Sequence, residues 1–312
     1  MRTLVVGAGA SIKEMNSSGR VSEFRFPTMA NFATEMWRTF QPEPFLSLYL
    51  QSIGVNTTSD ARQNVAIFCE LEKTNVTNVE RFFEFCWLNR NAIQDHPAAW
   101  SDMTYGCCFM PILDAMISCF HENGKGWIEL KAGGSVAKKL RPADLVVNLN
   151  YDVVFDLALE RSGKAFEYVP IVDNPESVQI AKPHGSINLD VNRLEQTFCF
   201  CLPSKIPGSL HSDTQSFSES ILPPRLNKNY EQHPISKAII KPLFDVRPTV
   251  LTFWGVGLTE SDTDLTALYQ VYSAAAGKVE FINPRRESKD RAETILNRPI
   301  EWHDDLDSWL AG

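Results

Sequence analysis

Three short polar segments hold the residues of this chain that are best suited to chemistry. They are Gly7-Ala8-Gly9-Ala10-Ser11, Asn150-Tyr151-Asp152 and Lys182-Pro183-His184-Gly185-Ser186. Glycines let a backbone approach a ligand without a Cβ in the way, so the first segment is a place for a pyrophosphate. The imidazole of an unperturbed histidine titrates close to neutral pH, so His184 could transfer a proton.

Each of these segments follows an apolar run that predicts a buried strand, at residues 3–6, 144–149 and 178–181. Open α/β sheets bind ligands at the carboxyl ends of their strands, so the segments are expected at one sheet edge. The glycine segment lacks the third glycine of the dinucleotide fingerprint, and no acidic residue clearly ends a second strand about 20 residues later. This disfavours a hydride-transfer enzyme. The backbone amides of residues 8–11 either face a pyrophosphate or form a tight strand-to-helix turn.

In this order the three segments resemble the sirtuin superfamily, and its bacterial anti-phage branch of NAD-hydrolysing sirtuin-like proteins more closely than the protein deacylases. Two further turns, Gly255-Val256-Gly257 after a strand at 249–254 and Asn283 after a strand at 278–282, are similar to the later nucleotide-contacting turns of the family. The resemblance implies that Asn150 positions the attacking group or water beside the nicotinamide ribose, and that His184 is the general base. It also implies NAD contacts from Gly7, Ala8, Gly9, Ala10, Ser11, Asp152, Gly255, Val256, Gly257 and Asn283.

The activity implied by this resemblance is that of an NAD+ glycohydrolase, which releases nicotinamide and ADP-ribose. Such cleavage would deplete cellular NAD in anti-phage defence, so we expect regulation by self-assembly into a homo-oligomer or by a separate partner, an ATPase/helicase or an Argonaute-like protein. Two alternatives are an NAD-dependent protein deacylase and a catalytically silent module that senses NAD or ADP-ribose.

Several positions depart from the deacylase pattern. Zinc-bearing sirtuins carry two Cys-x-x-Cys pairs after the catalytic histidine, whereas here only Cys199-Phe200-Cys201 follows His184, so no zinc is expected. Glu23-Phe24-Arg25 is only weakly similar to the deacylase stretch that reaches toward the nicotinamide. Asp152 could equally cap the helix that follows it, and Asp262 and Asp264 are expected to act as helix N-terminal acids.

The alternation of apolar runs and helices after residue 144 predicts a Rossmann-like, doubly wound parallel sheet with residues 1–6 as a central strand. Residues 28–140 instead show helical spacing and predict an all-helical insertion, which leaves residues 1–27 and 141–312 as the NAD-binding catalytic domain. The proline-rich segment 203–234 is expected to be a long loop that could fold over the site. Helices are expected at 28–40, 61–73, 78–92, 105–121, 152–161, 235–244, 262–276 and 287–296.

Composition agrees with an ordinary globular protein of 312 residues, 44% of them hydrophobic. The net charge of −8 works against direct nucleic-acid binding. No apolar stretch is long enough to cross a membrane, and the first residues do not read as a secretory signal. The seven cysteines are odd in number and lack paired spacing, which favours a reducing compartment, and we expect a cytoplasmic location.

Overall fold

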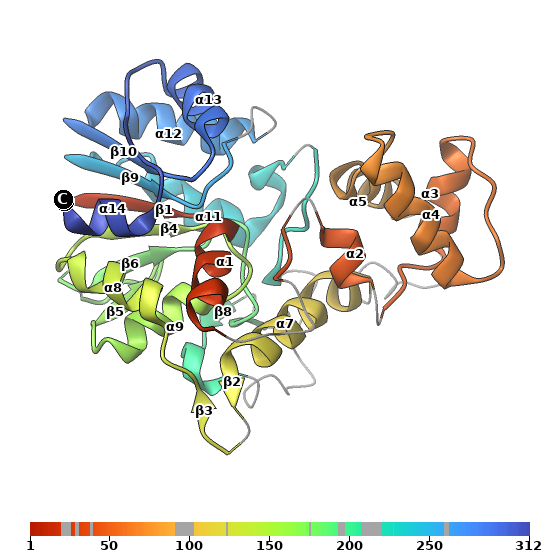
Figure 1. Ribbon diagram of the computed structural model, residues 1–312, viewed down its shortest axis with the longest axis horizontal. Helices are drawn as coiled ribbons and strands as arrows, with labels where there is room; N and C mark the ends of the chain where they lie inside the picture. The colour runs from red at the N-terminus through yellow and green to blue at the C-terminus, as the bar shows by residue number, and fades with distance from the viewer. Residues whose placement is uncertain are drawn as a thin grey trace.

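A seven-stranded parallel sheet forms the centre of the molecule, with strand order β11-β10-β9-β1-β4-β6-β5 (Figure 1). Its first strand in sequence, β1, is flanked by β4 and β9, which confirms the prediction of a parallel α/β sheet with a central N-terminal strand. The strands are β1 (Arg2–Val6), β4 (Leu145–Asn148), β5 (Phe166–Tyr168), β6 (Val178–Ala181), β9 (Val250–Trp254), β10 (Lys278–Ile282) and β11 (Glu301–His303). The computed structural model of the chain describes residues 1–19, 26–28, 31–37, 40–90, 103–122, 124–174, 176–192, 197–206, 220–226, 228–258 and 262–312.

Helices cover both faces of this sheet because successive side chains of a strand point to opposite sides. Leu4 and Val6 join one buried core, whereas Val5 joins the other. The core with Leu4 and Val6 is covered by α1 (Ala8–Ser17), α8 (Lys131–Lys139), α9 (Val154–Arg161) and α14 (Leu306–Ala311). The core with Val5 is covered by α11 (Pro234–Leu243), α12 (Thr263–Ala275) and α13 (Arg286–Leu296).

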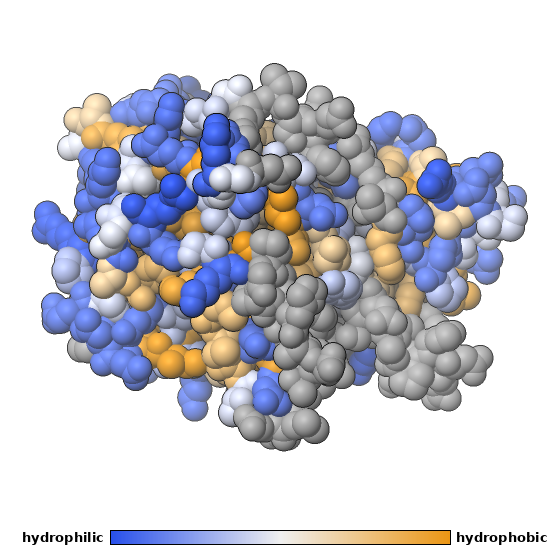
Figure 2. Space-filling model, turned by 90° about the horizontal axis from the view of Figure 1, so that it is seen from below, coloured by the Kyte–Doolittle hydropathy of each residue, from blue (hydrophilic) through white to orange (hydrophobic). Residues whose placement is uncertain are grey.

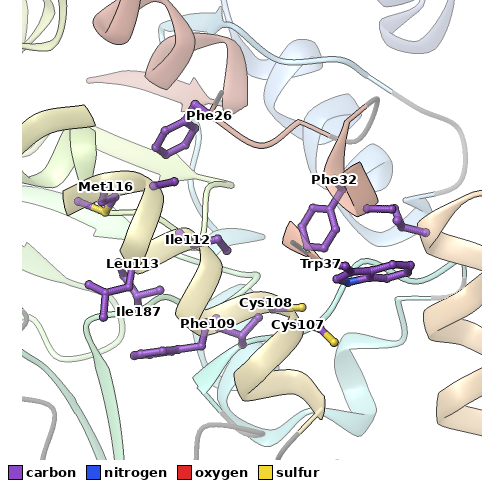
Figure 3. Packing of buried hydrophobic residues seen from close by; sticks show 14 of the residues in the cluster. Phe26, Phe32, Trp37, Cys107, Cys108, Phe109, Ile112, Leu113, Met116 and Ile187 are labelled. Atoms are coloured by element: carbon purple, nitrogen blue, oxygen red, sulfur yellow. The ribbon is translucent and has the colours of Figure 1, made fainter. Parts of the chain in front are cut away.

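A helical lobe, α2 to α7, stands beside the sheet (Figure 1). Its interior is aromatic, with the Trp37 ring 4.9 Å from Phe68 and 5.0 Å from Phe82, measured between centroids. The same apolar cluster continues through α7 to Ile187 and to α9, so the lobe shares its core with the α/β part (Figure 3). The lobe consists of α2 (Phe32–Met36), α3 (Phe45–Ser52), α4 (Ala61–Lys73), α5 (Val79–Asn89), a π-helix (Tyr105–Phe109) and α7 (Met110–Phe120).

The helix predicted over 28–40 is wrong in extent, because α2 covers only Phe32–Met36. The backbone N–H and the hydroxyl of Thr28 both donate to Asn31 Oδ1, at 2.6 and 2.8 Å, which forms a turn where a helix was expected. After the helix, Trp37 has left helical geometry, with φ −95° and ψ 21°. The segment Glu23-Phe24-Arg25 lies outside the described residues.

Helix α8 lies within the predicted insertion 28–140 but packs on α1 and α9 against the sheet. The other elements are two small antiparallel hairpins, β2 (His121–Glu122) with β3 (Gly126–Trp127) and β7 (Leu189–Asn192) with β8 (Thr197–Phe200), and the 3-10 turns Pro203–Lys205 and Tyr230–Gln232. Within the described part of the chain, no helix combines the length and apolar character that a bilayer crossing needs. On the face seen from below, hydrophilic residues are interspersed with smaller apolar areas (Figure 2).

Candidate active site

The five predicted site segments lie at one edge of the sheet, where the parallel strands end. Gly7 follows β1, Gly255 follows β9 and Asn283 follows β10, while Asn150 and His184 come shortly after β4 and β6. The edge is therefore built from side chains and turns that are far apart in sequence.

The glycine turn after β1 packs directly against the glycine turn after β9. Gly7 N–H donates to Trp254 O and Gly9 N–H to Gly255 O, each at 3.0 Å. Gly255 has a φ of +65°, and a Cβ built on it would lie 2.3 Å from the Ala10 nitrogen. This close contact between backbones explains the glycines without a ligand.

Phosphate binding by residues 8–11 stays a prediction. The amides of Gly9 and Ala10 already donate to backbone carbonyls, the latter to Gly7 O at 2.9 Å. At the other turn, a Cβ on Gly257 would meet no atom of the described residues within 4 Å. Asn283 connects the two later turns, because its Nδ2 donates to Val256 O at 3.2 Å.

Asn150 joins the second motif to the first. Its Nδ2 donates to Gly7 O at 3.1 Å and to Ser11 Oγ at 3.2 Å, and its backbone N–H donates to Asn148 Oδ1. The residue is only 7% exposed. Among the described residues, no group donates a hydrogen bond to Asn150 Oδ1, so the orientation of the amide leaves its oxygen as an acceptor for a ligand.

Asp152 lies one residue before Val153, the N-cap of α9, and accepts from Val154 N–H at 2.9 Å, so it satisfies a free amide at the helix start, which is close to one of its two predicted roles. Its other oxygen accepts from Ser11 Oγ at 3.0 Å. Burial raises the pKa of Asp152 to about 6, against the opposing charge of Lys182. Contact of Asp152 with NAD stays a prediction.

His184 is fixed through both ring nitrogens. Its Nδ1 lies 2.9 Å from Leu149 O, and because a carbonyl only accepts, Nδ1 carries the proton. Its Nε2 lies 2.8 Å from Tyr230 Oη and 3.4 Å from Asp262 Oδ2. Burial and then the charge of Lys228 lower the pKa of His184, so the imidazole is neutral at neutral pH and Nε2 presents a lone pair.

Asp262 is a larger part of the site than its sequence context indicates. It caps α12 as predicted, by accepting from Leu265 N–H. It also accepts from Tyr230 Oη at 3.0 Å and pairs with Lys228 Nζ at 3.2 Å. Burial opposes its ionisation, but His184 when it is protonated, the charge of Lys228 and the hydrogen bond from Tyr230 outweigh burial and hold the pKa of Asp262 well below its usual range.

Lys228 and Tyr230 belong to the segment 203–234, and other residues of this segment bond to the backbone around His184. Leu222 N–H donates to His184 O, and Ser186 N–H donates to Ser220 O, both at 2.8 Å. The composition of this segment predicts a loop over the site, but no local pattern distinguishes Tyr230 from an ordinary core tyrosine.

A fully buried ion pair lies beneath these groups. Lys182 Nζ is 3.2 Å from Asp156 Oδ2 and donates to Asp152 O at 2.6 Å. Asp156 also accepts from Asn148 Nδ2 and from Tyr168 Oη, at 2.7 and 2.9 Å. The pair ties α9 to the end of β6, and the Asn148 hydrogen bond adds the end of β4, so the network supports the turns that carry Asn150 and His184. Neither Asp156 nor Tyr168 was predicted as part of the site.

A small pocket of about 30 Å³ opens between α5 and the segment 203–234, and it includes neither Asn150 nor His184. Its lining is Trp87, Leu222, Pro223, Arg225, Asn229, Gln232 and His233. Among the residues that the structure describes, no group of three or more His, Cys, Asp or Glu side chains is placed to share a metal ion, and the absence of zinc stays a prediction.

Fold and site together define an α/β protein with a Rossmann-like parallel sheet, whose strand ends carry an Asn–Ser–Asp cluster beside a His–Tyr–Asp cluster. No family model matches the chain, and no curated protein matches its sequence.

Proposed function

We propose that this protein is an NAD+ glycohydrolase that cleaves the bond between nicotinamide and its ribose. The observation that carries the proposal is the joining of two motifs: His184 Nδ1 binds the carbonyl of Leu149, the residue directly before Asn150. This contact brings the neutral imidazole to the backbone beside Asn150, whose amide oxygen has no donor among the described residues, at the carboxyl edge of a parallel sheet, where nucleotides bind in such folds.

The reaction requires few protein groups besides the Asn150 amide and the His184 imidazole. Nicotinamide is a good leaving group, and its departure leaves an oxocarbenium-like ribose. Asn150 Oδ1 can accept a hydrogen bond from a ribose hydroxyl or from the attacking water, which fixes the nucleophile near C1′. His184 can receive the proton that this nucleophile gives up, because it is neutral at neutral pH. With water as nucleophile the products are nicotinamide and ADP-ribose.

The test is incubation of the purified protein with NAD alone, followed by chromatography of nicotinamide and ADP-ribose. Asn150→Ala and His184→Ala should each reduce nicotinamide release by about 100-fold or more, the range of a lost general acid–base group. Asn56→Ala, at an exposed position, and His303→Ala, at the edge strand β11, are matched controls that should retain it. Unchanged release in Asn150→Ala and His184→Ala would refute the proposed active site.

A second candidate is a module that binds NAD or ADP-ribose without turnover. It is favoured by one observation, that protein groups occupy both ring nitrogens of His184. Calorimetric binding of either nucleotide, with no nicotinamide released over hours, would support it. Turnover only in the presence of an acylated lysine peptide would instead indicate a protein deacylase.

The biological setting belongs to the same proposal and rests on the sequence resemblance. An NAD-depleting effector of anti-phage defence would act in the cytoplasm and stay inactive until infection. Activation would come from assembly of this chain with itself or from an ATPase/helicase or Argonaute-like partner. Size-exclusion chromatography with and without the product of the adjacent gene, coupled to the NAD assay, tests these points.

A further inference from the structure

The Tyr230 hydroxyl lies between the imidazole of His184 and the carboxylate of Asp262. Its oxygen is 2.8 Å from His184 Nε2 and 3.0 Å from Asp262 Oδ2. A phenol has a single proton, so it can donate to only one of these two acceptors at a time. Movement of that proton couples the charge of His184 to Asp262.

We propose that Asp262 is a positioning residue for His184, and that protons reach the imidazole through the Tyr230 hydroxyl. The catalytic consequence of this inference rests on the proposed function, but the coupling between the three side chains does not.

The three groups are held rigidly. Asp262 is fixed by the α12 amide that it caps and by Lys228. Tyr230 is 2% exposed and belongs to the same apolar core as Leu251 and Phe253 of β9, with its ring plane at 12° to that of His184. Packing in this core holds the Tyr230 hydroxyl at His184 Nε2, where it blocks direct access of a substrate to that nitrogen. Because Nδ1 is bound to Leu149 O and Nε2 faces Tyr230 Oη, a proton that arrives through Tyr230 Oη reaches the ring without displacing either contact.

The transfer balances in one step. The O–H bond of a substrate hydroxyl or water breaks, and its proton goes to the Tyr230 oxygen as the Tyr230 proton passes to His184 Nε2. The electron pair of the broken bond stays on the nucleophile, which is then able to attack. The new imidazolium is stabilised by the Asp262 carboxylate, 3.4 Å from Nε2, which stays ionised throughout.

The charges around His184 determine in which direction each substitution should shift its pKa. Burial and Lys228 lower the pKa of His184, whereas Asp262 and the Leu149 carbonyl raise it. Farther groups act on these neighbours: Glu80 of α5 on Lys228 and Asp262, Asp264 on Asp262, and Glu80 and Cys108 on Tyr151, whose ring lies 6.1 Å from that of His184. Removing the Asp262 charge should therefore lower the pKa of His184, and removing the Lys228 charge should raise it.

The first test titrates the imidazole by NMR in protein labelled with ¹³C at histidine Cε1, with the His184 signal assigned by its loss in His184→Asn. Asp262→Asn should move the His184 midpoint to lower pH, and Lys228→Met should move it to higher pH. Asparagine also caps helices, so α12 should persist. Asp305→Asn, which changes the equivalent cap of α14, is the matched control and should leave the midpoint unchanged. Loosening of the site would move both variants in the same direction, so equal shifts, or no shift, would overturn the coupling.

The second test uses turnover of NAD. Asp262→Asn should lower kcat by about 10- to 100-fold, part of what a general base contributes, with KM for NAD little changed. In the pH profile of kcat, the acid limb of Asp262→Asn should move to lower pH, and the acid limb of Lys228→Met should move to higher pH. Tyr230→Phe should lower kcat at least as much as Asp262→Asn. Higher activity of Tyr230→Phe would mean that the hydroxyl blocks His184 and would overturn the relay. If the wild type does not cleave NAD, the proposed function fails, while the NMR titration still decides the coupling.

Discussion

Asn150 Nδ2 donates to Ser11 Oγ at 3.2 Å, across a sequence separation of 139 positions. The same hydroxyl donates to Asp152 at 3.0 Å, so Ser11 fixes both polar residues of the second motif. A turn predicted to bind phosphate is thus also the support of the predicted catalytic asparagine.

This relationship predicts that Ser11→Ala lowers activity through Asn150. We expect a fall in kcat of about 10-fold and a loss of about 1 kcal/mol in the free energy of unfolding, because a buried hydrogen-bonding group loses its partner. Urea denaturation and NAD turnover measure the two effects. Ser135→Ala, which removes an exposed hydroxyl from α8, is the control. If Ser11→Ala keeps full turnover, Ser11 does not position Asn150.

The contact between the two glycine turns predicts a different outcome for two neighbouring glycines. Gly255→Ala should destabilise the protein by about 1–3 kcal/mol, because alanine resists the φ of +65° and its Cβ would overlap the Ala10 nitrogen. Gly257→Ala should leave stability unchanged, because its Cβ would meet no atom of the described residues within 4 Å. Thermal melting compares them, and equal melting temperatures would contradict the described packing.

The buried ion pair predicts a strong asymmetry between two lysines. Lys182→Met should cost about 3–5 kcal/mol, because Asp156 would remain as a buried charge without its partner. Lys73→Met breaks an exposed pair with Glu70 of shorter distance, 2.6 Å, and should have no measurable effect. Denaturant titrations of both variants provide the measurement. A small loss for Lys182→Met would contradict the stabilising role of the buried pair.

The raised pKa of Asp152 predicts a pH dependence of stability. The folded protein holds this proton up to a pKa of about 6, whereas the unfolded chain releases it near the ordinary 3.8. The folded state therefore binds more protons in this window, and the contribution of Asp152 to stability falls as pH rises from about 4 to 6.

Asp152→Asn removes that dependence and still offers an acceptor to the Val154 amide. Relative to wild type, the variant should gain about 2–3 kcal/mol between pH 4 and pH 7. Chemical denaturation at several pH values measures the difference, in which the other acidic groups cancel. Parallel curves of unfolding free energy against pH for the two proteins would show that folding does not raise the pKa of Asp152.

Much of the fold was predictable because its signals are local. Apolar runs located β1, β4, β6, β9 and β10, and the order of strands and helices indicated that their carboxyl ends share one edge. Caps were equally local, since Asn78 and Asp262 each accept from an amide three residues ahead. The central sheet and the gathering of the motif turns at its edge follow from these patterns.

Elements with weak local signals were missed. The strands β5 and β11 have three residues each, too few to show a period. Helix α8 contains Gly133 and Gly134 and has no side-chain cap of its own. It begins where it does because Glu14, 119 positions away, accepts from Gly133 N–H at 2.6 Å. A helix cap that a residue distant in sequence supplies cannot be predicted from the residues next to the helix.

The sequence by itself determined which polar turns meet at the sheet edge and which strands present them, because alternation and turn residues act over a few positions. Only the tertiary structure decided that Tyr230 and Asp262 would face His184, and that Ser11 would fix Asn150. These partners are brought together by the packing of α12 and the segment 203–234 onto the sheet, and that packing depends on the whole core rather than on any spacing along the chain.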